Sequence, residues 1–439
     1  MVAALIIVLV SVVIMIACIL FFPKLCIGKF QMDTFFLAPL LGAILLLSLG
    51  LANPSTTLDA FISDKGMNPL KILALFLSMS FLSIVLDEAG LFRFLAEKSL
   101  SRSKGSQKKM FVLLYLLTSI LTVFTSNDVI ILTFTPFLIY FCKRAKIDPL
   151  PFLIEEFIAA NTFSMVFLIG NPTNIYLASN SGVDFISYFQ VMWLPSIMAG
   201  LIAFAILYLL FRRKLSTPMS AEKSSPVLED PLLVYFGTAI LAIVVVLLAV
   251  SSYIGFEMYL ICVLAAAIYL AFALVYCALK KEGKRWLILT ASLKRVPYTL
   301  IPFLLSMFVL VEALYENGVS FELAKMLSGA TPYVSYLGSS LLFCNLINNI
   351  PMSVLFSSSI ASFFETPSLP ALYSSIIGSN IGAFLTPLGA LAGIMWMGLL
   401  KKGEVKLSFL GFMKYGFLVG IPTAAAAGLG LYLSFLFLA

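Results

Sequence analysis

Polar residues interrupt the apolar sequence of this chain at four places, and their side chains are of types that bind ions and small solutes. Ser126, Asn127 and Asp128 divide the apolar stretch 110–142, and "NLINNIP" (345–351) divides the stretch 333–364. "GNPTN" (170–174) and "TPLGA" (386–390) are the other two interruptions. Carbonyl groups freed where a membrane helix unwinds bind cations, and half-helix amino ends bind anions or polar solutes. The alternative is that Gly and Pro only kink packed helices, but four interruptions in two pairs favour a transport site.

The composition places these interruptions in a membrane. Of the 439 residues, 61% are hydrophobic and 11% are charged, and the mean hydropathy is +1.07. So few charges cannot cover a soluble globule, whereas the length leaves room for about ten spans of ~20 residues. The absence of histidine excludes histidine proton relays and histidine metal sites. Six scattered cysteines without CxxC, and the lack of HExxH or GxSxG, predict neither a metal site, a cofactor nor an enzyme.

Eight apolar runs are long enough to cross the hydrocarbon core of a bilayer. The first lacks a basic start and a cleavage site, so it is expected to be a span and not a signal peptide. The runs are 1–22, 34–52, 69–90, 188–211, 231–250, 257–279, 297–315 and 408–437.

Basic residues set the predicted orientation. Clusters at 98–109 and 143–146 flank the stretch 110–142 on both sides, so both its ends are expected in the cytoplasm. A re-entrant hairpin fits this better than one long tilted span. The stretch 333–364 has only Lys325 as a basic neighbour and is expected to enter from outside. Both termini of this multi-pass protein of the cell (plasma) membrane are then outside. The net charge of +7 lies in these short clusters, which indicates topology and not a nucleic-acid partner.

The two halves of the chain resemble each other. "LSMSFLSIVLDEAG" (77–90) aligns with "LSMFVLVEALYENG" (305–318), and "NTFSMVFLIGNPTN" (161–174) aligns with "NIGAFLTPLGALAG" (380–393). Since one hairpin enters from each side, the repeat is inverted, as in many secondary transporters. The predicted fold class is an all-α polytopic membrane protein with two inverted repeats, each holding a re-entrant hairpin and a broken helix.

The expected boundaries follow from this repeat. The first repeat, 1–211, has scaffold spans in 1–90, a hairpin at 110–142, a broken helix at 155–181 and a span at 188–211. A polar, Ser/Pro-rich cytoplasmic linker covers 212–230. The second repeat, 231–439, has scaffold spans in 231–315, a hairpin at 333–364, a broken helix at 371–400 and a span at 408–437.

Two acidic residues are candidates for coupling transport to an ion gradient. Asp128 lies at a hairpin tip, where a carboxylate is costly and is therefore a functional candidate by default. Its protonation can depend on which side of the membrane the site faces and on which ligand is bound. Asp128 would then exchange a proton or sodium for the solute. The alternative is that it caps the following helix. Glu312, inside a span, is the next candidate, whereas Asp87, Glu88 and Glu316 lie near span ends and are expected at the interface.

The motifs "LDEAGLF", "SNDVIILTFTP", "NNIPMSVL" and "GSNIGAFLTPLGALAGIMW" resemble the arsenite permeases (arsenical pump membrane proteins) of the ion transporter superfamily, over about 35–425. The superfamily also holds sodium/proton antiporters and dicarboxylate/citrate carriers, which "GNPTNI" resembles more closely. The resemblance implies no cofactor and a coupling ion that is a proton or sodium. It is compatible with a homodimer and with a soluble ATPase partner. The implied site residues are Asn127, Asp128, Asn348 and Asn349 at the tips, Asn161, Asn171, Thr173, Asn174, Asn380, Thr386 and Gly389 in the broken helices, and Ser126 and Gly170 beside them.

The leading function is a secondary carrier that exports arsenite or antimonite by exchange with protons. Arsenite is a neutral trihydroxy solute at neutral pH, which suits a site of Asn, Thr and Ser groups without a fixed cation. The alternative is a sodium-coupled carrier, either a sodium/proton antiporter or a transporter of small organic anions such as dicarboxylates. In both cases the expected partners are a small inorganic or organic solute and membrane lipid.

Overall fold

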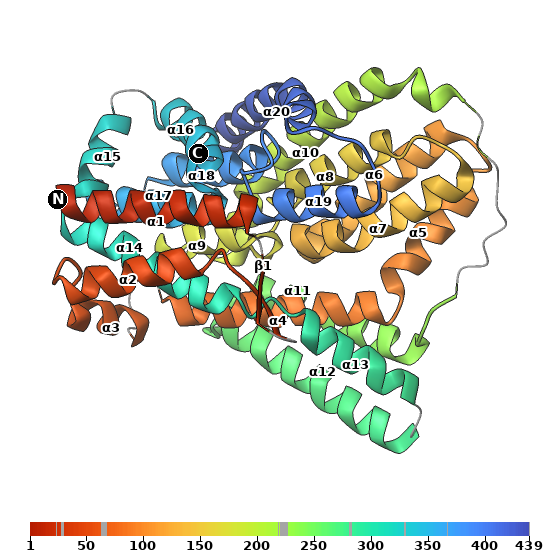
Figure 1. Ribbon diagram of the computed structural model, residues 1–439, viewed down its shortest axis with the longest axis horizontal. Coiled ribbons are helices and arrows are strands. Elements are labelled where there is room, and N and C mark those ends of the chain that lie inside the picture. The colour runs from red at the N-terminus through yellow and green to blue at the C-terminus, as the bar shows by residue number, and fades with distance from the viewer. Residues whose placement is uncertain are drawn as a thin grey trace.

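The computed structural model describes residues 1–22, 24–27, 30–62, 68–217, 219, 227–280, 283–328, 331–366 and 368–438. Almost all of the described elements are helices (Figure 1). Within this part of the chain, eight helical segments are long and apolar enough to cross a membrane. The prediction of an all-α polytopic membrane protein is confirmed.

The elements of the first half begin with a scaffold of helices and one small hairpin of strands. These are α1 (Val2–Phe21), β1 (Lys24–Ile27), β2 (Phe30–Asp33), α2 (Leu37–Ser48), α3 (Pro54–Ile62), α4 (Pro69–Glu88) and α5 (Leu91–Arg102). The helical hairpin, the broken helix and the last long helix follow. These are α6 (Gln107–Phe124), α7 (Asn127–Ala145), α8 (Leu150–Phe163), η1 (Leu168–Gly170), α9 (Pro172–Asn180), α10 (Phe185–Phe211) and η2 (Lys214–Ser216).

The second half repeats this order. Its scaffold helices are α11 (Pro231–Ile254), α12 (Met258–Lys280), α13 (Gly283–Arg295), α14 (Leu300–Glu316) and α15 (Val319–Leu327). Its hairpin, broken helix and last helix are α16 (Pro332–Ile347), α17 (Asn349–Phe363), α18 (Leu369–Gly382), α19 (Leu391–Lys402) and α20 (Phe409–Leu438).

Corresponding elements of the halves agree in detail. Helices α8 and α18 both have 14 residues, and the alignment of Asn161 with Asn380 brings their ends into register. Gly90 and Gly318 hold the same left-handed conformation, with φ of 93° and 75°, at the starts of α5 and α15. Only glycine adopts this conformation at no steric cost. The internal sequence repeat is therefore a structural repeat.

Helices of each half pack against helices of the other half. Helix α12 packs on α4 of the first half, and α2 packs on α14 of the second. In the same way α9 packs on α17, and α19 packs on α7. Helices α6 and α7 lie towards one end of the molecule, and α15 and α16 lie towards the opposite end (Figure 1). This arrangement is an inverted repeat.

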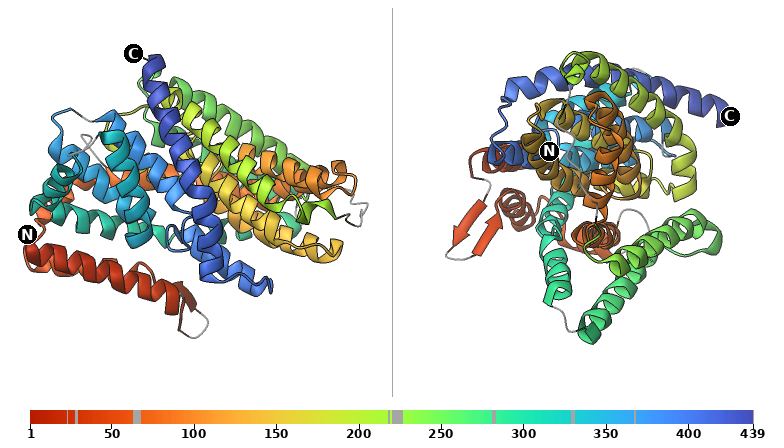
Figure 2. Two further views of the ribbon diagram at one scale, coloured as in Figure 1. Left: turned by 90° about the horizontal axis from the view of Figure 1, so that it is seen from above. Right: turned by 90° about the vertical axis from the view of Figure 1, so that its right-hand side faces the viewer.

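The two chain ends lie towards the same end of the molecule as α15 and α16 (Figures 1 and 2). Helix η2, which lies within the predicted linker, is towards the other end (Figure 1). Residues 218 and 220–226 of that linker are outside the described residues. Which end faces the cytoplasm stays a prediction from the basic residues.

Two features differ from the sequence prediction. The run 34–52 was expected to cross the bilayer, but α2 has 12 residues, a length of about 18 Å that does not span ~30 Å. It ends because Gly50 takes a left-handed conformation, with φ of 66°. The antiparallel pair β1–β2, in which Lys24 faces Asp33, was not predicted because its strands have only four residues each.

We expect Lys146→Cys to react with a membrane-impermeant maleimide only from the cytoplasmic side, and Glu365→Cys only from outside. The two positions lie on loops after α7 and α17, and the positive-inside rule assigns the basic loop to the cytoplasm. Labelling of right-side-out and inverted vesicles measures the side from which each cysteine reacts. Reaction of both positions from the same side would contradict the inverted repeat, and reversed sides would contradict only the orientation.

Candidate functional site

The first hairpin turns at Thr125 and Ser126, between α6 and α7. Asn127 begins α7 and donates a hydrogen bond from Nδ2 to Asn161 Oδ1 of α8 at 3.1 Å. Ser126 Oγ and Asn127 Oδ1 are buried and have no hydrogen-bond partner. Asp128 is half-buried beside them, and no described residue makes a hydrogen bond or ion pair with its carboxylate. The first tip thus gathers oxygen atoms that the protein does not satisfy.

Asp128 is not the cap of α7. The N-cap position is held by Ser126, whose side chain makes no capping hydrogen bond, and Asp128 lies two residues further on. Its negative charge is still favourable there, because the amino end of a helix carries partial positive charge. The alternative of a simple N-cap is therefore wrong.

The second tip, in contrast, is tied to its broken helix. Asn348 donates from Nδ2 to the carbonyl of Leu388 at 3.1 Å, and its Oδ1 accepts from the Ile350 amide at the start of α17. The backbone N–H of Asn349 donates to the carbonyl of Gly389 at 3.0 Å. Asn348 has φ of 76°, a strained conformation for a residue with a side chain. The Asn348 side chain and the Asn349 backbone thus dock this tip onto the break at 386–390.

The two broken helices meet at Asn380. Its Oδ1 accepts from Ser164 Oγ at 2.8 Å and from Asn171 Nδ2 at 2.9 Å. Its Nδ2 donates to Asn174 Oδ1 at 2.7 Å and to the carbonyl of Ile376 at 2.8 Å. All four Asn380 bonds lie in the buried interior. We call Asn380, Asn171, Asn174 and Ser164 the central amide network.

This network satisfies backbone groups that the helix break releases. Asn174 Nδ2 donates to the carbonyls of Ser164 and Phe167, which lie between α8 and η1. Both ends of the Asn174 amide thus have protein partners in this conformation, and its contact with solute stays a prediction. Asn161 likewise uses both ends of its amide, with Asn127 and with the carbonyl of Phe157.

The remaining predicted site residues divide by role. A Cβ atom at Gly170 would collide with the carbonyl of Ser164, and one at Gly389 with the carbonyl of Gly382, so both glycines permit close backbone approach. Thr386 donates from Oγ1 to Asn345 Oδ1 at 2.7 Å. Thr173 Oγ1, in contrast, is buried without a partner and stays open to a ligand.

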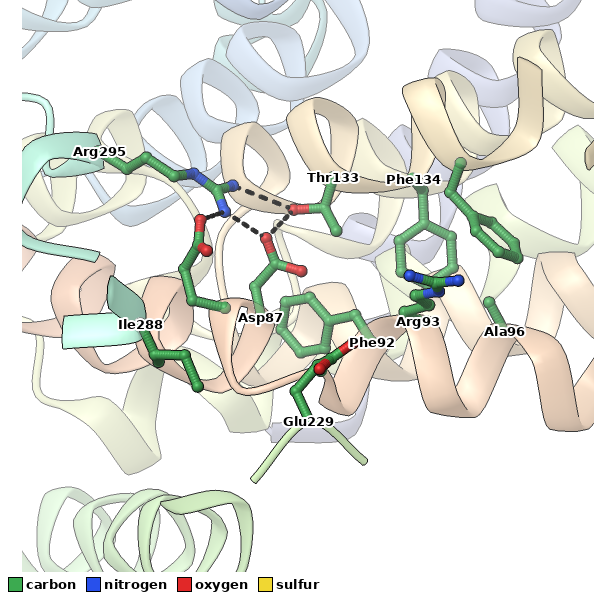
Figure 3. Close-up of a pocket in the computed structure, with 12 residues that line it drawn as sticks. Asp87, Phe92, Arg93, Ala96, Thr133, Phe134, Glu229, Ile288 and Arg295 are labelled. Atoms are coloured by element: carbon green, nitrogen blue, oxygen red, sulfur yellow. Dashed lines mark hydrogen bonds and ion pairs between the residues drawn. The ribbon is translucent and has the colours of Figure 1, made fainter. Parts of the chain in front are cut away.

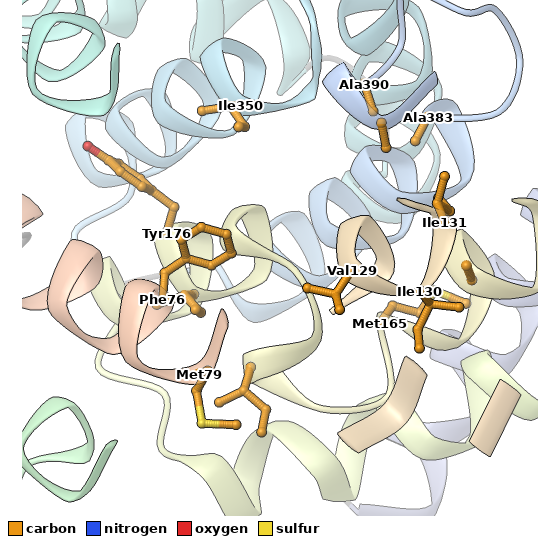
Figure 4. Packing of buried hydrophobic residues seen from close by; sticks show 14 of the residues in the cluster. Phe76, Met79, Val129, Ile130, Ile131, Met165, Tyr176, Ile350, Ala383 and Ala390 are labelled. Atoms are coloured by element: carbon orange, nitrogen blue, oxygen red, sulfur yellow. The ribbon is translucent and has the colours of Figure 1, made fainter. Parts of the chain in front are cut away.

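Apolar side chains surround the tips and breaks. Val129 and Ile130 follow the first tip, Ile350 follows the second, and Ala383 and Ala390 flank the second break (Figure 4). All five are buried. The polar groups described above therefore lie in a dry environment, where an unpaired polar group is costly.

Residues 34–378 match the family described as citrate transporter (CitMHS). The chain belongs to the citrate transporter family. It is 26% identical to the putative arsenical pump membrane protein of Bacillus subtilis (strain 168), over 77% of this chain and 81% of that protein. It is 25% identical to the arsenical pump membrane protein of Escherichia coli (strain K12), over 82% of this chain and 86% of that protein. The predicted resemblance to these proteins of the ion transporter superfamily is confirmed.

A third relative and a solved structure cover still more of the chain. The 46 kDa membrane protein of Mycobacterium leprae (strain TN) is 27% identical over 91% of this chain and 94% of its own. The YdaH transporter of Alcanivorax borkumensis shares the fold, with a TM-score of 0.59 and 13% identity, over 99% of this chain and 98% of that chain. The protein is thus a multi-pass membrane transporter, as predicted.

In this citrate transporter family member, a cavity of about 360 Å³ lies where α4, α7 and α13 meet (Figure 3). Asp87 Oδ2 accepts from Thr133 Oγ1 at 2.8 Å and from Arg295 at 2.6 Å, and Arg295 also pairs with Glu88 at 2.6 Å. Asp87 is therefore part of an ion-pair cluster that joins the scaffold to the first hairpin, which the sequence did not predict, while its place at the membrane interface stays a prediction. Glu316, as expected, is exposed and accepts from the Asn53 amide.

A second cavity of about 360 Å³ lies at the other end of α4, beside Lys71 and Ile175 of α9. Each cavity thus opens between the scaffold and the unit of hairpins and broken helices, one at each end of α4. Glu312 of α14 is half-buried and lies near Tyr176 of α9. The structure does not bring it together with Asp128.

Three important polar residues were missed by sequence reasoning. Asn345 of α16 donates to the carbonyl of Gly382 and accepts from the Thr386 amide, so it satisfies the second break. Its place in "NLINNIP" was a usable signal. Glu155 and Glu156 of α8 are 0% and 1% exposed, and nothing in the local sequence separates them from acids at a helix end.

We expect Asn380→Ala to lower the thermal unfolding midpoint of the protein in detergent. The change leaves Asn171 Nδ2 and Asn174 Oδ1 unpaired in the interior, and each such group costs about 1 to 3 kcal/mol, whereas Ser164 Oγ keeps its bond to the carbonyl of Asn161. Asn317→Ala is the matched control, since it also removes two donated bonds, but at a half-exposed helix end where water replaces them. Equal shifts in the two variants would contradict the central role of the network.

Proposed function

We propose that this protein is a secondary carrier that exports arsenite or antimonite by exchange with protons, through alternating access at the first hairpin tip. The observation that carries the proposal is the group of unsatisfied oxygens at that tip, Ser126 Oγ and Asn127 Oδ1, beside Asp128, which has no partner among the described residues. Costly groups of this kind in a dry interior mark ion and substrate pathways.

The chemistry of the tips and breaks supports a neutral polyhydroxyl solute. The segments 125–128, 161–174, 345–351 and 380–390 contain no Lys or Arg. A site of hydroxyl and amide groups offers donors and acceptors to the three hydroxyl groups of arsenite without a fixed charge. Two relatives that cover most of the chain carry the name arsenical pump membrane protein, which favours the same class of solute.

The two cavities support alternating access. One lies between α4 and α7, the other between α4 and α9, at opposite ends of α4. A movement of the hairpin unit along α4 would widen one cavity as it narrows the other. The Asp87–Arg295–Thr133 cluster joins α4, α13 and α7, so it would have to break and re-form as the first cavity opens.

A sodium-coupled carrier of small organic anions is the second candidate. Hydroxyl, amide and carboxylate oxygens are hard ligands of the kind that a sodium ion takes, and Ser126, Asn127 and Asp128 supply all three. A sodium ion there would give the site the positive charge that a carboxylate solute needs. The description of the family as citrate transporters favours this candidate.

Proteoliposomes with an imposed gradient separate the two candidates. We expect accumulated arsenite or antimonite to depend on a pH gradient, without a sodium requirement and without competition from citrate. Dependence on sodium together with competition by citrate would replace the first candidate with the second.

We expect Asp128→Asn to bind solute but to lose gradient-driven accumulation, because the amide keeps the shape and cannot carry a proton. Counterflow, the exchange of labelled for unlabelled solute without a gradient, should remain. Asp59→Asn, at an exposed position of α3, is the control and should behave as the wild type. A variant of Asp128 that still concentrates solute would move the coupling elsewhere, with Glu312 as the next candidate.

A further inference from the structure

Two adjacent carboxyl groups, Glu155 and Glu156, are buried in α8, behind the first hairpin. The acidic side chains that are buried in the described part of the chain are these two and Asp230. Asp230 is paired with Arg285 at 2.8 Å. No described basic side chain pairs with Glu155 or Glu156, so their charge is not neutralised by the protein.

The two side chains face different neighbours. Glu156 accepts a hydrogen bond from Thr135 Oγ1 of α7 at 3.0 Å, and Trp396 of α19 lies beside it. Both carboxyl oxygens of Glu155 are buried without any hydrogen-bond partner. The ionisable groups that interact with Glu155 are Glu156 and Tyr115 of α6, whose hydroxyl already donates to the Gly200 carbonyl of α10. Among the described residues of α7, α10 and α18, no ionisable side chain interacts with Glu155.

Such a pair cannot carry two negative charges in this conformation. Moving a single carboxylate out of water costs several kcal/mol even after the protein relaxes, and a second carboxylate on the next residue adds repulsion. A buried group without a partner charge avoids this cost by binding a proton. The pair is therefore a proton-binding site while α8 is dry.

The repeat shows that α8 does not need these carboxyl groups in order to fold. Their counterparts in α18 are Ser374 and Ser375, at the same register of a helix of the same length. Ser375 Oγ donates to the carbonyl of Ala371, and Ser374 Oγ to the carbonyl of Tyr333. The first half thus holds costly ionisable groups where the second half holds satisfied hydroxyls.

The pair is also linked to the coupling candidate. Thr135 and Asp128 are seven residues apart on α7, which places them on one helix face about 10 Å apart along the axis. Helices α7 and α8 run antiparallel, with Asn127 bonded to Asn161 at one level and Thr135 bonded to Glu156 nearer the predicted cytoplasmic end. Any movement of α7 therefore changes the surroundings of Asp128 and of Glu156 together.

We propose that Glu155 and Glu156 form a second proton-binding site, which takes up and releases a proton in the transport cycle in addition to Asp128. The proton is held on a carboxyl oxygen of the pair while α6, α7 and α10 exclude water. It leaves when movement of the first hairpin admits water to α8, and the carboxylate that remains is then hydrated. This inference rests on the proposed exchange of solute for protons.

Infrared spectroscopy of the purified full-length protein tests the proton without any transport. Protonated carboxylic acids have a carbonyl band that carboxylates lack. We expect the wild type at neutral pH to show this band. The double replacement Glu155→Gln with Glu156→Gln should lose part of it, because either carboxyl group alone could still hold the proton. Glu322→Gln, at an exposed position of α15, is the control and should match the wild type. Identical bands in the wild type and the double variant would overturn the proposal, whatever the solute is.

Flux in proteoliposomes then tests the release of the proton. We expect the double glutamine variant to keep counterflow and to lose part of the solute accumulation driven by a pH gradient. The double replacement Glu155→Ser with Glu156→Ser copies the second repeat, and it serves if the glutamine variant fails to fold. Unchanged proton-driven accumulation in a variant that has lost the infrared band would show a proton that is held but not exchanged, and would overturn the role in transport. A wild type that does not accumulate arsenite would overturn the proposed solute and leave the infrared result standing.

Discussion

Asn380 is the residue on which the centre of the molecule depends, because two helices end beside it in an apolar interior. A helix that stops there leaves backbone groups that water cannot reach, and each one is costly unless a side chain satisfies it. Asn380 binds Ser164, Asn171 and Asn174 at once, and Asn174 in turn satisfies the freed carbonyls of the first break. The broken helices are thereby joined into one unit, which both tips then contact.

The two tips contact this unit differently. The difference follows from which helix carries the asparagine side chain that bonds the free backbone groups of each break. In the second half, Asn345 reaches the break from the hairpin arm α16, so satisfying the break also fixes the hairpin. In the first half, Asn174 reaches the break from α9, and the hairpin is held to α8 through Asn127 and Thr135. The first tip therefore keeps oxygen atoms that are free to take a ligand.

The sequence was sufficient to locate the breaks, the repeat and most of the long apolar helices, because each depends on local composition. Asn and Pro within an apolar run stand out, and so does the pairing of "NTFSMVFLIGNPTN" with "NIGAFLTPLGALAG". Burial of Glu155 and Glu156 could not be predicted in this way, since it results from α6, α7 and α10 covering one side of α8. The length of α2 was overestimated for a related reason, because hydropathy does not report the left-handed turn at Gly50.

Comparison of equivalent positions shows that the two halves differ in their ionisable side chains. Asp128 in the first half corresponds to Ile350 in the second, and Glu155 and Glu156 correspond to Ser374 and Ser375. The ionisable side chains of the buried hairpin unit are thus concentrated in one half, although the backbone is repeated in both. A symmetric scaffold supplies two states of similar energy, which alternating access needs. Under the proposed exchange with protons, a charge that differs between the halves would make the balance between these states depend on a bound ion, because an ion can shift an equilibrium only through its different affinity for the two states.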